Sequence, residues 1–289
     1  GMEAYRRLEM WAEAICTGGL LTSVHCLLGS LTEAKKVAYE CRAMAEGQGC
    51  ETWARMTALS RLAEVDTFTG EFPEGERLFD EGFRLILRNP AHNTSPEPEL
   101  AALCRSYDTR DAQVAIVAFI QRYCNFSNAA GEHGRAIQWA SLCQRIIKED
   151  LPAVQDDLHS GLCELYLGEA YLRKEKLEQN GTDAEVLIKA EGLLNDAAIH
   201  LRVASRQNEL PRALLLLAEI ACRLDSLPRD LRATPPRNFR QELRNRLDEA
   251  WEIAERGSMK LHMADIHQCR ARLCSHWRPY PWGRNPDGS

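Results

Sequence analysis

Residues 131–148 of this chain read Gly-Glu-His-Gly-Arg-Ala-Ile-Gln-Trp-Ala-Ser-Leu-Cys-Gln-Arg-Ile-Ile-Lys. After the opening glycine, the small or apolar residues Ala136, Ala140, Cys143 and Ile147 follow one another at steps of four, three and four. That spacing places the four side chains on one face of an α-helix. The stretch therefore predicts a tight turn followed by a helix that buries one face.

The same pattern of turn glycine and helix recurs along the chain. Gly29 and Gly70 precede comparable helices, and two later helices, over residues 190–197 and 243–250, fit the same spacing. A small residue at the last aligned position lets neighbouring helices approach closely, as stacked helical hairpins require. The residues at this position are Cys41, Gly82, Cys143, Ala197 and Ala250.

The composition favours helix over all 289 residues, of which 45% are hydrophobic, 27% charged and only 7% aromatic. No stretch alternates for long with the period of two that is typical of strands. We predict a single all-α region, residues 1–289, made of three parts. A leading helix over residues 2–17 ends at Gly18-Gly19, helix pairs fill residues 18–277, and residues 278–289 form an irregular tail.

A second recurring phrase lies in the first helix of each pair, most clearly as Leu167-Gly168-Glu-Ala-Tyr171. Together with Gly131, Ala136 and the small residue seven further on, it resembles the tetratricopeptide repeat (TPR). The resemblance covers about residues 18–275, with spacings longer and less even than the usual 34 or so residues. It implies a right-handed superhelical solenoid of antiparallel helix hairpins with about five irregular repeats.

Long, irregular pairs of this kind are similar to the C-terminal helical regions of bacterial STAND-type signalling ATPases and related regulators. The stretch over residues 250–265 carries this likeness, whereas a P-loop pattern G-x-x-x-x-G-K-[ST] does not occur. The resemblance implies the sensor or partner-binding region of a larger bacterial signalling or regulatory protein. We accordingly expect the tail to be truncated and the chain to be a piece of something larger.

Charge and cysteine usage narrow the possible partners and the compartment. With a net charge of −6, we expect no nucleic-acid partner, and a basic stripe over residues 229–246 is only a weaker third option. No apolar run approaches the roughly 20 residues of a membrane span, so we expect no membrane. Eleven cysteines without a C-x-x-C pair favour free thiols and a cytoplasmic location.

We expect no catalysis, no cofactor and no metal. G-x-S-x-G and H-E-x-x-H patterns are absent, and the densest set of potential metal ligands lies on the last helix, where the histidines diverge around the helix axis. The alternative is a helical enzyme with a site in the concave groove built from Glu64, Glu169 and Glu219. Such an enzyme needs two carboxylates with raised pKa values in one closed pocket. The potential metal ligands are His262, Asp265, His267, Cys269, Cys274 and His276.

The resemblance also implies where a partner binds. In the TPR fold the first helices line a concave face, and residues just after the apolar–small pair point into it. The glutamates among these residues predict an acidic column suited to a protein or peptide partner that carries basic residues. The predicted partner-binding residues are Glu64, Phe68, Gln121, Asn125, Glu169, Arg173, Glu219 and Arg223.

A plainer interpretation of the same residues stays open. Glu169 and Arg173, like Glu219 and Arg223, stand four apart and can be ordinary surface ion pairs that contribute a few tenths of a kcal/mol each. Family members that bind chaperones hold a peptide C-terminal carboxylate with Lys, Asn and Arg, and the glutamates here argue against that mode. A solenoid cut within a repeat exposes an apolar end face, which leaves room for a dimer through that end.

Overall fold

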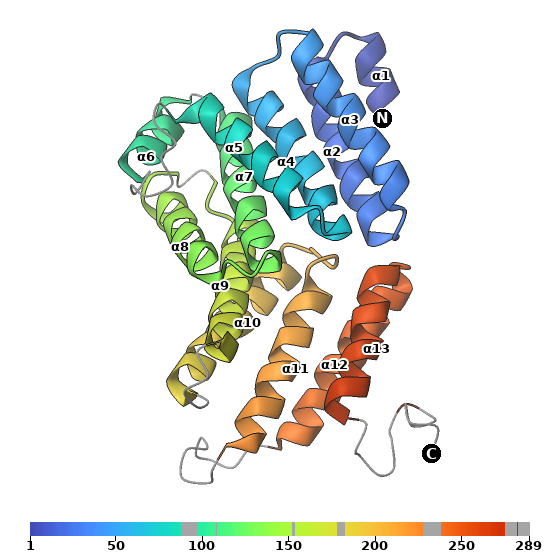
Figure 1. Cartoon of the computed structure of the whole chain (residues 1–289), viewed down its shortest axis with the longest axis vertical. Helices are drawn as coiled ribbons and strands as arrows, with labels where there is room; N and C mark the ends of the chain where they lie inside the picture. Colours follow the sequence, from blue (N-terminus) through green and yellow to red (C-terminus); the bar gives the residue numbers. More distant parts are fainter. Residues whose placement is uncertain are drawn as a thin grey trace.

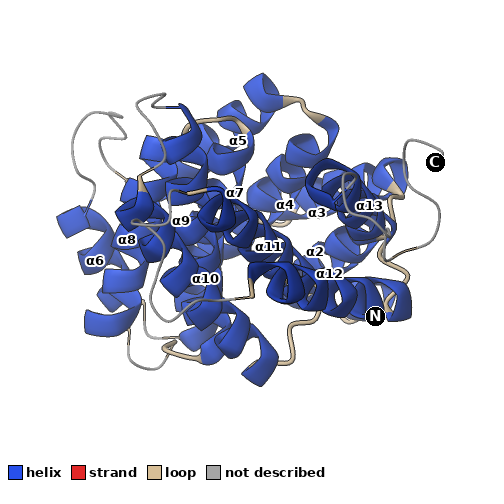
Figure 2. Cartoon of the chain, turned by 90° about the horizontal axis from the view of Figure 1, so that it is seen from below, coloured by secondary structure: helices blue, strands red, loops and turns tan. Residues whose placement is uncertain are grey.

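The computed structural model of the chain describes residues 1–87, 97–107, 109–151, 154–177, 183–227, 238–274 and Trp282. Within these ranges every regular element is an α-helix (Figure 2), which confirms the all-α prediction. In the same ranges, none of the helices combines the length and the apolar character needed to cross a membrane. The helices are α1 (Met2–Arg7), α2 (Trp11–Leu27), α3 (Leu31–Gly47), α4 (Thr52–Thr69), α5 (Phe72–Ile86), α6 (Glu97–Ser106), α7 (Arg110–Ala129), α8 (His133–Glu149), α9 (Asp157–Leu177), α10 (Ala184–Val203), α11 (Leu210–Ser226), α12 (Phe239–Arg256) and α13 (Lys260–Cys274).

Eleven of the described helices fall into two groups that pack differently. Helices α2, α4, α7, α9, α11 and α13, called the inner helices below, form a row in which each contacts the next. Helices α3, α5, α8, α10 and α12, the outer helices, each pack against the two inner helices that flank them in sequence. The row bends into an arc, and α13 returns to contact α2 (Figure 1). The first and last inner helices therefore meet.

The start of the chain differs from the prediction of one helix over residues 2–17. The first helix ends early, and α2 continues straight through Gly18-Gly19. The glycines serve close packing: a Cβ on Gly18 would overlap the sulfur of Cys41, and one on Gly19 would lie 3.0 Å from Nε of Arg61. Both glycines are buried within α2, where neighbouring side chains occupy the space that a Cβ would need. The prediction of a break at Gly18-Gly19 was therefore wrong.

The five aligned small residues are all buried, and at Gly82 the fit against the neighbouring helix is tight. A Cβ on Gly82 would overlap the ring of Phe119 on α7, and one on Gly168 would lie 2.8 Å from Cγ of Leu194 on α10. These contacts confirm that the small residues permit close approach between neighbouring helices.

The largest side chains of the core gather beside Gly82. Six aromatic rings from α5, α7 and α8 pack edge-on, tilted or, for Tyr123 and Phe126, stacked, with centroids 4.8–6.3 Å apart, within the range that aromatic pairs prefer. This cluster fixes α5 and α8 on the outer side of α7. Its members are Phe79, Phe83, Phe119, Tyr123, Phe126 and Trp139.

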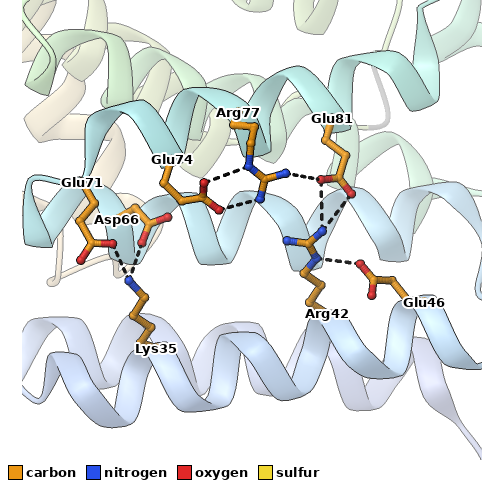
Figure 3. Close-up of polar contacts among 8 residues, drawn as sticks. All are labelled: Lys35, Arg42, Glu46, Asp66, Glu71, Glu74, Arg77 and Glu81. Carbon is orange, nitrogen blue, oxygen red and sulfur yellow. Dashed lines mark hydrogen bonds and ion pairs between the residues drawn. The ribbon is translucent and has the colours of Figure 1, made fainter.

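The outer helices are also connected by charge. Arg42 on α3 pairs with Glu81 on α5 (3.2 Å), and Lys35 contacts both Glu71 (2.6 Å) and the buried Asp66 (3.2 Å) (Figure 3). Exposed pairs of this kind contribute only about 0.2–1 kcal/mol each. Their effect is to align neighbouring outer helices, while packing supplies most of the stability.

The predicted tail and two helix starts fall largely outside the described ranges. Of residues 278–289 the structure describes only Trp282, whose Nε1 donates to Oδ1 of Asp248 (2.5 Å). The sequence also predicts a helix that starts at Pro152 and a helix cap at Thr182, and both residues lie outside the described residues. The cap observed on α10 is Asp183, whose carboxylate accepts from two backbone N–H groups of the first turn.

We predict that Gly82→Ala lowers the free energy of unfolding by about 1–2 kcal/mol. Overpacking against Phe119 costs about 1–3 kcal/mol, partly offset by the roughly 0.5–1 kcal/mol that alanine gains over glycine inside a helix. The matched control is Gly192→Ala in α10, where a Cβ meets nothing within 4 Å and should stabilise. Urea unfolding of both variants measures this, and equal effects would contradict the close-approach argument.

Candidate functional site

A cavity of about 400 Å³ lies on the inner side of the arc, within the size range of ligand pockets. Its lining comes from all six inner helices and from the two residues that precede α11. Among the described residues, no outer helix contributes to it. The concave side is therefore a shared pocket, which we call the central cavity, formed by segments that span the whole chain.

Most of the predicted partner-binding residues lie in one place. Two do not line the cavity, namely Gln121 and Arg223. The helical spacing thus identified residues of α4, α7, α9 and α11 that face a common cavity. The predicted residues that line the central cavity are Glu64, Phe68, Asn125, Glu169, Arg173 and Glu219.

Gln121 is a packing residue of the α7–α9 interface. Its side chain is buried, its Nε2 donates to the backbone carbonyl of His159 (2.9 Å), and its Oε1 accepts from Nδ1 of the same histidine (3.1 Å). Both ends of the amide are thereby satisfied at the start of α9. Gln121 holds α9 against α7. It does not line the cavity, because the start of α9 covers this part of α7.

At the α4–α7 wall, two arginines share one carboxylate. Arg61 Nη1 donates to Glu64 (2.7 Å) and to the hydroxyl of Ser23, and Arg122 Nε lies 3.7 Å from the same carboxylate. Burial alone would raise the pKa of Glu64, yet Arg61 and Arg122 outweigh it and lower that pKa. Burial and the neighbouring Arg61 lower the pKa of Arg122 to about 9. Glu64 is thus held ionised.

The middle of the cavity is bridged by Arg212 of α11. Its Nη2 donates to Glu169 (2.5 Å) and its Nη1 to the amide oxygen of Asn125 (2.6 Å), so that one guanidinium connects α11 with α9 and α7. Burial opposes the charge, but Glu169 more than compensates and raises the pKa of Arg212. A planar guanidinium suits this fork of two acceptors better than an ammonium would.

Three arginines surround Glu219, an arrangement that we call the Glu219 cluster. Arg173 of α9 (3.1 Å), Arg223 of α11 (2.7 Å) and Arg272 of α13 (2.8 Å) all donate to this carboxylate. Burial would raise the pKa of Glu219, but the three arginines outweigh it and lower that pKa to about 2. The carboxylate side chain is only 7% exposed. One glutamate therefore joins three successive inner helices.

These contacts change the meaning of the predicted acidic column. Glu64, Glu169 and Glu219 each already accept from arginine, so the column is neutralised from within and is not an open cradle for a basic peptide. The plainer interpretation is also incomplete. Glu219 does pair with Arg223 and Glu169 lies 4.0 Å from Arg173, but the carboxylates are buried and join different helices.

Two further carboxyl groups and a histidine complete the polar lining. Burial raises the pKa of Glu209 despite the nearby Arg212, and burial likewise raises the pKa of Asp265 against the influence of His262 and Arg212. Nε2 of His262 donates to the backbone carbonyl of Asn208 (2.8 Å), which leaves Nδ1 as the basic nitrogen. Glu209 and Asp265 therefore hold their protons more readily than ordinary carboxyl groups.

The cavity also has an apolar side, next to α2 and α4. Phe68, 42% exposed, and Leu27 line it. On α2 the exposed residues Leu20 (55%) and Val24 (49%) stand three residues before the lining residues Ser23 and Leu27, respectively, which places them on the same side of the helix. The apolar lining therefore continues along α2 beyond the cavity.

Sequence reasoning missed most of the arginines. A signal existed for three of them: Arg61 and Arg122 each directly precede the apolar–small pair of their helix, and Arg212 stands seven residues, two helical turns, before Glu219. Arg272 carried no such signal, because the repeated phrase is absent from α13. Its place in the site comes only from the return of α13 to the row.

The potential metal ligands of α13 do not converge. His267 packs edge-on against Trp251, with 4.8 Å between ring centroids, whereas His262 and Asp265 line the cavity. His276 lies outside the described residues. No three such side chains come together as metal ligands in the part of the chain that is described, and all eleven cysteines are free.

Comparison of the chain with models of protein families, with curated proteins and with solved structures yields no match. The site therefore has to be interpreted from its own geometry.

We predict that the Glu219 cluster stabilises the protein at neutral pH and loses this effect in acid. Because the folded-state pKa is about 2 and the ordinary value 4.5, the contribution, on the order of 3 kcal/mol, is present above pH 4.5 and declines as the pH falls towards 2. Glu219→Gln lacks it. The difference in unfolding free energy between the parent and this variant should shrink from pH 7 to pH 3.5.

The matched control for this titration is Glu255→Gln on α12, an exposed position. Its difference from the parent should stay constant with pH. A constant difference for Glu219→Gln as well would show that the carboxylate is not held by the arginines.

Proposed function

We propose that this chain is a non-catalytic protein–protein interaction scaffold that binds a segment of a partner protein in the central cavity. The proposal includes the finer architecture, a right-handed superhelix of about five TPR-like hairpins. It also includes the setting: the sensor or partner-binding region of a larger bacterial signalling or regulatory protein in the cytoplasm. The repeated glycine and small-residue phrases support the architecture, and the likeness over residues 250–265 supports the setting.

One observation carries the proposal. The cavity is lined by the six inner helices and, among the described residues, by no outer helix, so that residues from α2 to α13 contribute to one pocket. Hairpins whose first helices face inward produce such a surface, and stacked helical repeats use it for recognition. The lining combines exposed apolar residues with arginines held in place by carboxylates. This suits the capture of a peptide segment, in which both side chains and backbone need partners.

The charged groups of the cavity are arranged for binding more than for proton transfer. A general acid or base needs a pKa near the working pH. Glu64 and Glu219 instead have lowered pKa values, so they remain ionised. Their role in the scaffold is to orient arginines.

One observation favours the alternative function, a helical enzyme. Glu209, Asp265 and His262 all line the same cavity, and the pKa values of the two carboxyl groups are raised. A catalytic site, if present, would use these three residues in place of the predicted Glu64, Glu169 and Glu219. The nature of the bound molecule separates the two functions, because a scaffold captures a polypeptide and this enzyme a small molecule.

We predict that a photo-crosslinking benzoylphenylalanine at Phe68 captures a polypeptide in cells that produce the chain. Phe68 is half-exposed within the cavity, so the probe fits without disturbing the core. Ala129→Trp, which fills the cavity from an exposed lining position at the end of α7, should reduce the capture at least tenfold. Mass spectrometry of the crosslinked product identifies what was bound.

Two controls accompany this measurement. The same probe at Tyr39, 48% exposed on the outer helix α3, should not capture that polypeptide. Ala102→Trp, at an exposed position of α6, should leave capture at Phe68 unchanged. A small molecule in place of a polypeptide would favour the enzyme, and equal capture at both probe positions would remove the cavity from the proposal. The dimer through the solenoid end stays a prediction that sedimentation of the same protein tests.

A further inference from the structure

Helix α13 is the least buried of the inner helices. The structure describes α13 throughout, and only four of its 15 residues are buried, compared with eleven of 17 in α11. Two of the four are cysteines and one is Arg270, so Ile266 is the one large aliphatic side chain that α13 buries. Segments with few buried apolar contacts open locally at a lower free energy than the rest of a fold. Helix α13 is therefore the inner helix that apolar packing holds least.

The place of α13 at the end of the row explains this low burial. Helices α4, α7, α9 and α11 each lie between two outer helices. In the described part of the chain, α13 packs against one outer helix, α12, and otherwise meets the inner helices α11 and α2. One flank of α13 therefore lacks the cover that those four inner helices receive.

Trp282 supplies an additional contact at the junction of α13 and α12. The guanidinium carbon of Arg270 on α13 lies 4.6 Å from the ring centroid of Trp282 and 5.0 Å from that of Trp251 on α12. Nε1 of Trp282 donates to Oδ1 of Asp248 on α12, which also accepts from Nη2 of Arg270 (3.4 Å). Arg270 is only 5% exposed, and cation–π contacts are stronger where water is excluded. Trp282 thus connects α13 to α12.

On the side of the central cavity, α13 is held by polar contacts. Arg272 donates to Glu219 of α11 (2.8 Å), and Nε2 of His262 donates to the backbone carbonyl of Asn208 (2.8 Å). Water replaces hydrogen bonds of this kind when a helix moves away, so the net cost of breaking them is modest. Separation of α13 from the cavity therefore breaks mainly contacts that water can replace.

The size of the central cavity gives such a movement a role. At about 400 Å³, the cavity lies near the lower end of the range for pockets that hold small molecules, whereas a polypeptide segment needs more room. Helix α13 contributes to the lining, and its contact with α2 closes the row of inner helices. Movement of α13 would both enlarge the cavity and open a passage to it. The lining residues of α13 are His262, Asp265, Gln268, Cys269 and Arg272.

We infer that α13 is a movable wall of the central cavity through which the partner segment enters, and that Trp282 holds this wall closed through Arg270 and Asp248. In the open state Arg272 leaves Glu219, and the side of the cavity between α11 and α2 becomes accessible. This inference rests on the proposed function, because it states how the segment reaches the site that the scaffold provides.

The test is hydrogen–deuterium exchange of the full chain, followed by mass spectrometry, because amide exchange reports local opening. In the parent, the protection factors of α13 should be at least tenfold lower than those of α11. Trp282→Ala should lower them at least tenfold further and leave α7 unchanged. Trp282→Phe keeps a ring beside Arg270 but loses the N–H donor to Asp248, so its effect should be smaller.

The matched control is Trp53→Ala at the start of α4. Trp53 is also half-buried, and its indole N–H also donates to a carboxylate, that of Glu51. This variant should leave the exchange of α13 unchanged, and circular dichroism checks that every variant is folded. Protection of α13 equal to that of α11, or unaltered by Trp282→Ala, would overturn the inference. Equal loss of protection in α7 would overturn it as well, because Trp282 would then support the whole fold.

The entry route is tested with the crosslinking probe at Phe68. If α13 is the wall that opens, Trp282→Ala should increase the initial rate of polypeptide capture at least threefold, and an unchanged rate would overturn the assignment of α13 as the entrance. The two proposals fail separately, because exchange needs no partner. If α13 opens as described but the probe captures no polypeptide, the scaffold falls and the movable wall stands. If capture occurs while α13 exchanges as slowly as α11, the scaffold stands and the movable wall falls.

Discussion

Close approach between neighbouring helices is the constraint on which the rest of this structure depends. Gly18, Gly82 and Gly168 stand where a Cβ would overlap or press on a side chain of the next helix. At each of these positions an inner helix packs closely against an outer helix, and this packing holds the inner helices in their row. Larger residues would force the helices apart and separate the side chains that now share one cavity. The packing of small residues thus decides which charged groups meet, although none of these glycines lies in the site.

The charges, in turn, reinforce the row at its inner edge. A buried carboxylate is costly unless several donors compensate it. Glu64 pairs with Arg61 of its own helix, whereas Glu169 and Glu219 pair with arginines of other helices. Glu219 alone joins α9, α11 and α13. The same interactions that hold the helices together therefore orient the guanidinium groups. The cavity is polar, although the surrounding core is aliphatic and aromatic, because these ion pairs line it.

The sequence predicted the helices and the inward face well, and the contacts between them poorly. Helical period alone placed Glu64, Asn125, Glu169 and Glu219 in the cavity, because a face is a local property of a helix. It failed for Gln121, since neighbouring helices decide which part of a face they cover. It failed for Gly18-Gly19, because glycine in a helix can mean a break or a close contact, and only the neighbour distinguishes them. The contact of Arg272 with Glu219 could not be predicted from the sequence, since it depends on where α13 packs.

The contact between α13 and α2 strengthens the ion pairs of the central cavity. In an open row, water would screen the guanidinium groups and each ion pair would contribute about 0–1 kcal/mol. With α13 packed against α2, the cavity is partly removed from water, and the same charges interact more strongly. Arg272 depends on this arrangement most directly, because it connects α13 with Glu219, which Arg173 and Arg223 also contact. The return of the last helix therefore completes the ion pairs that hold the inner helices together.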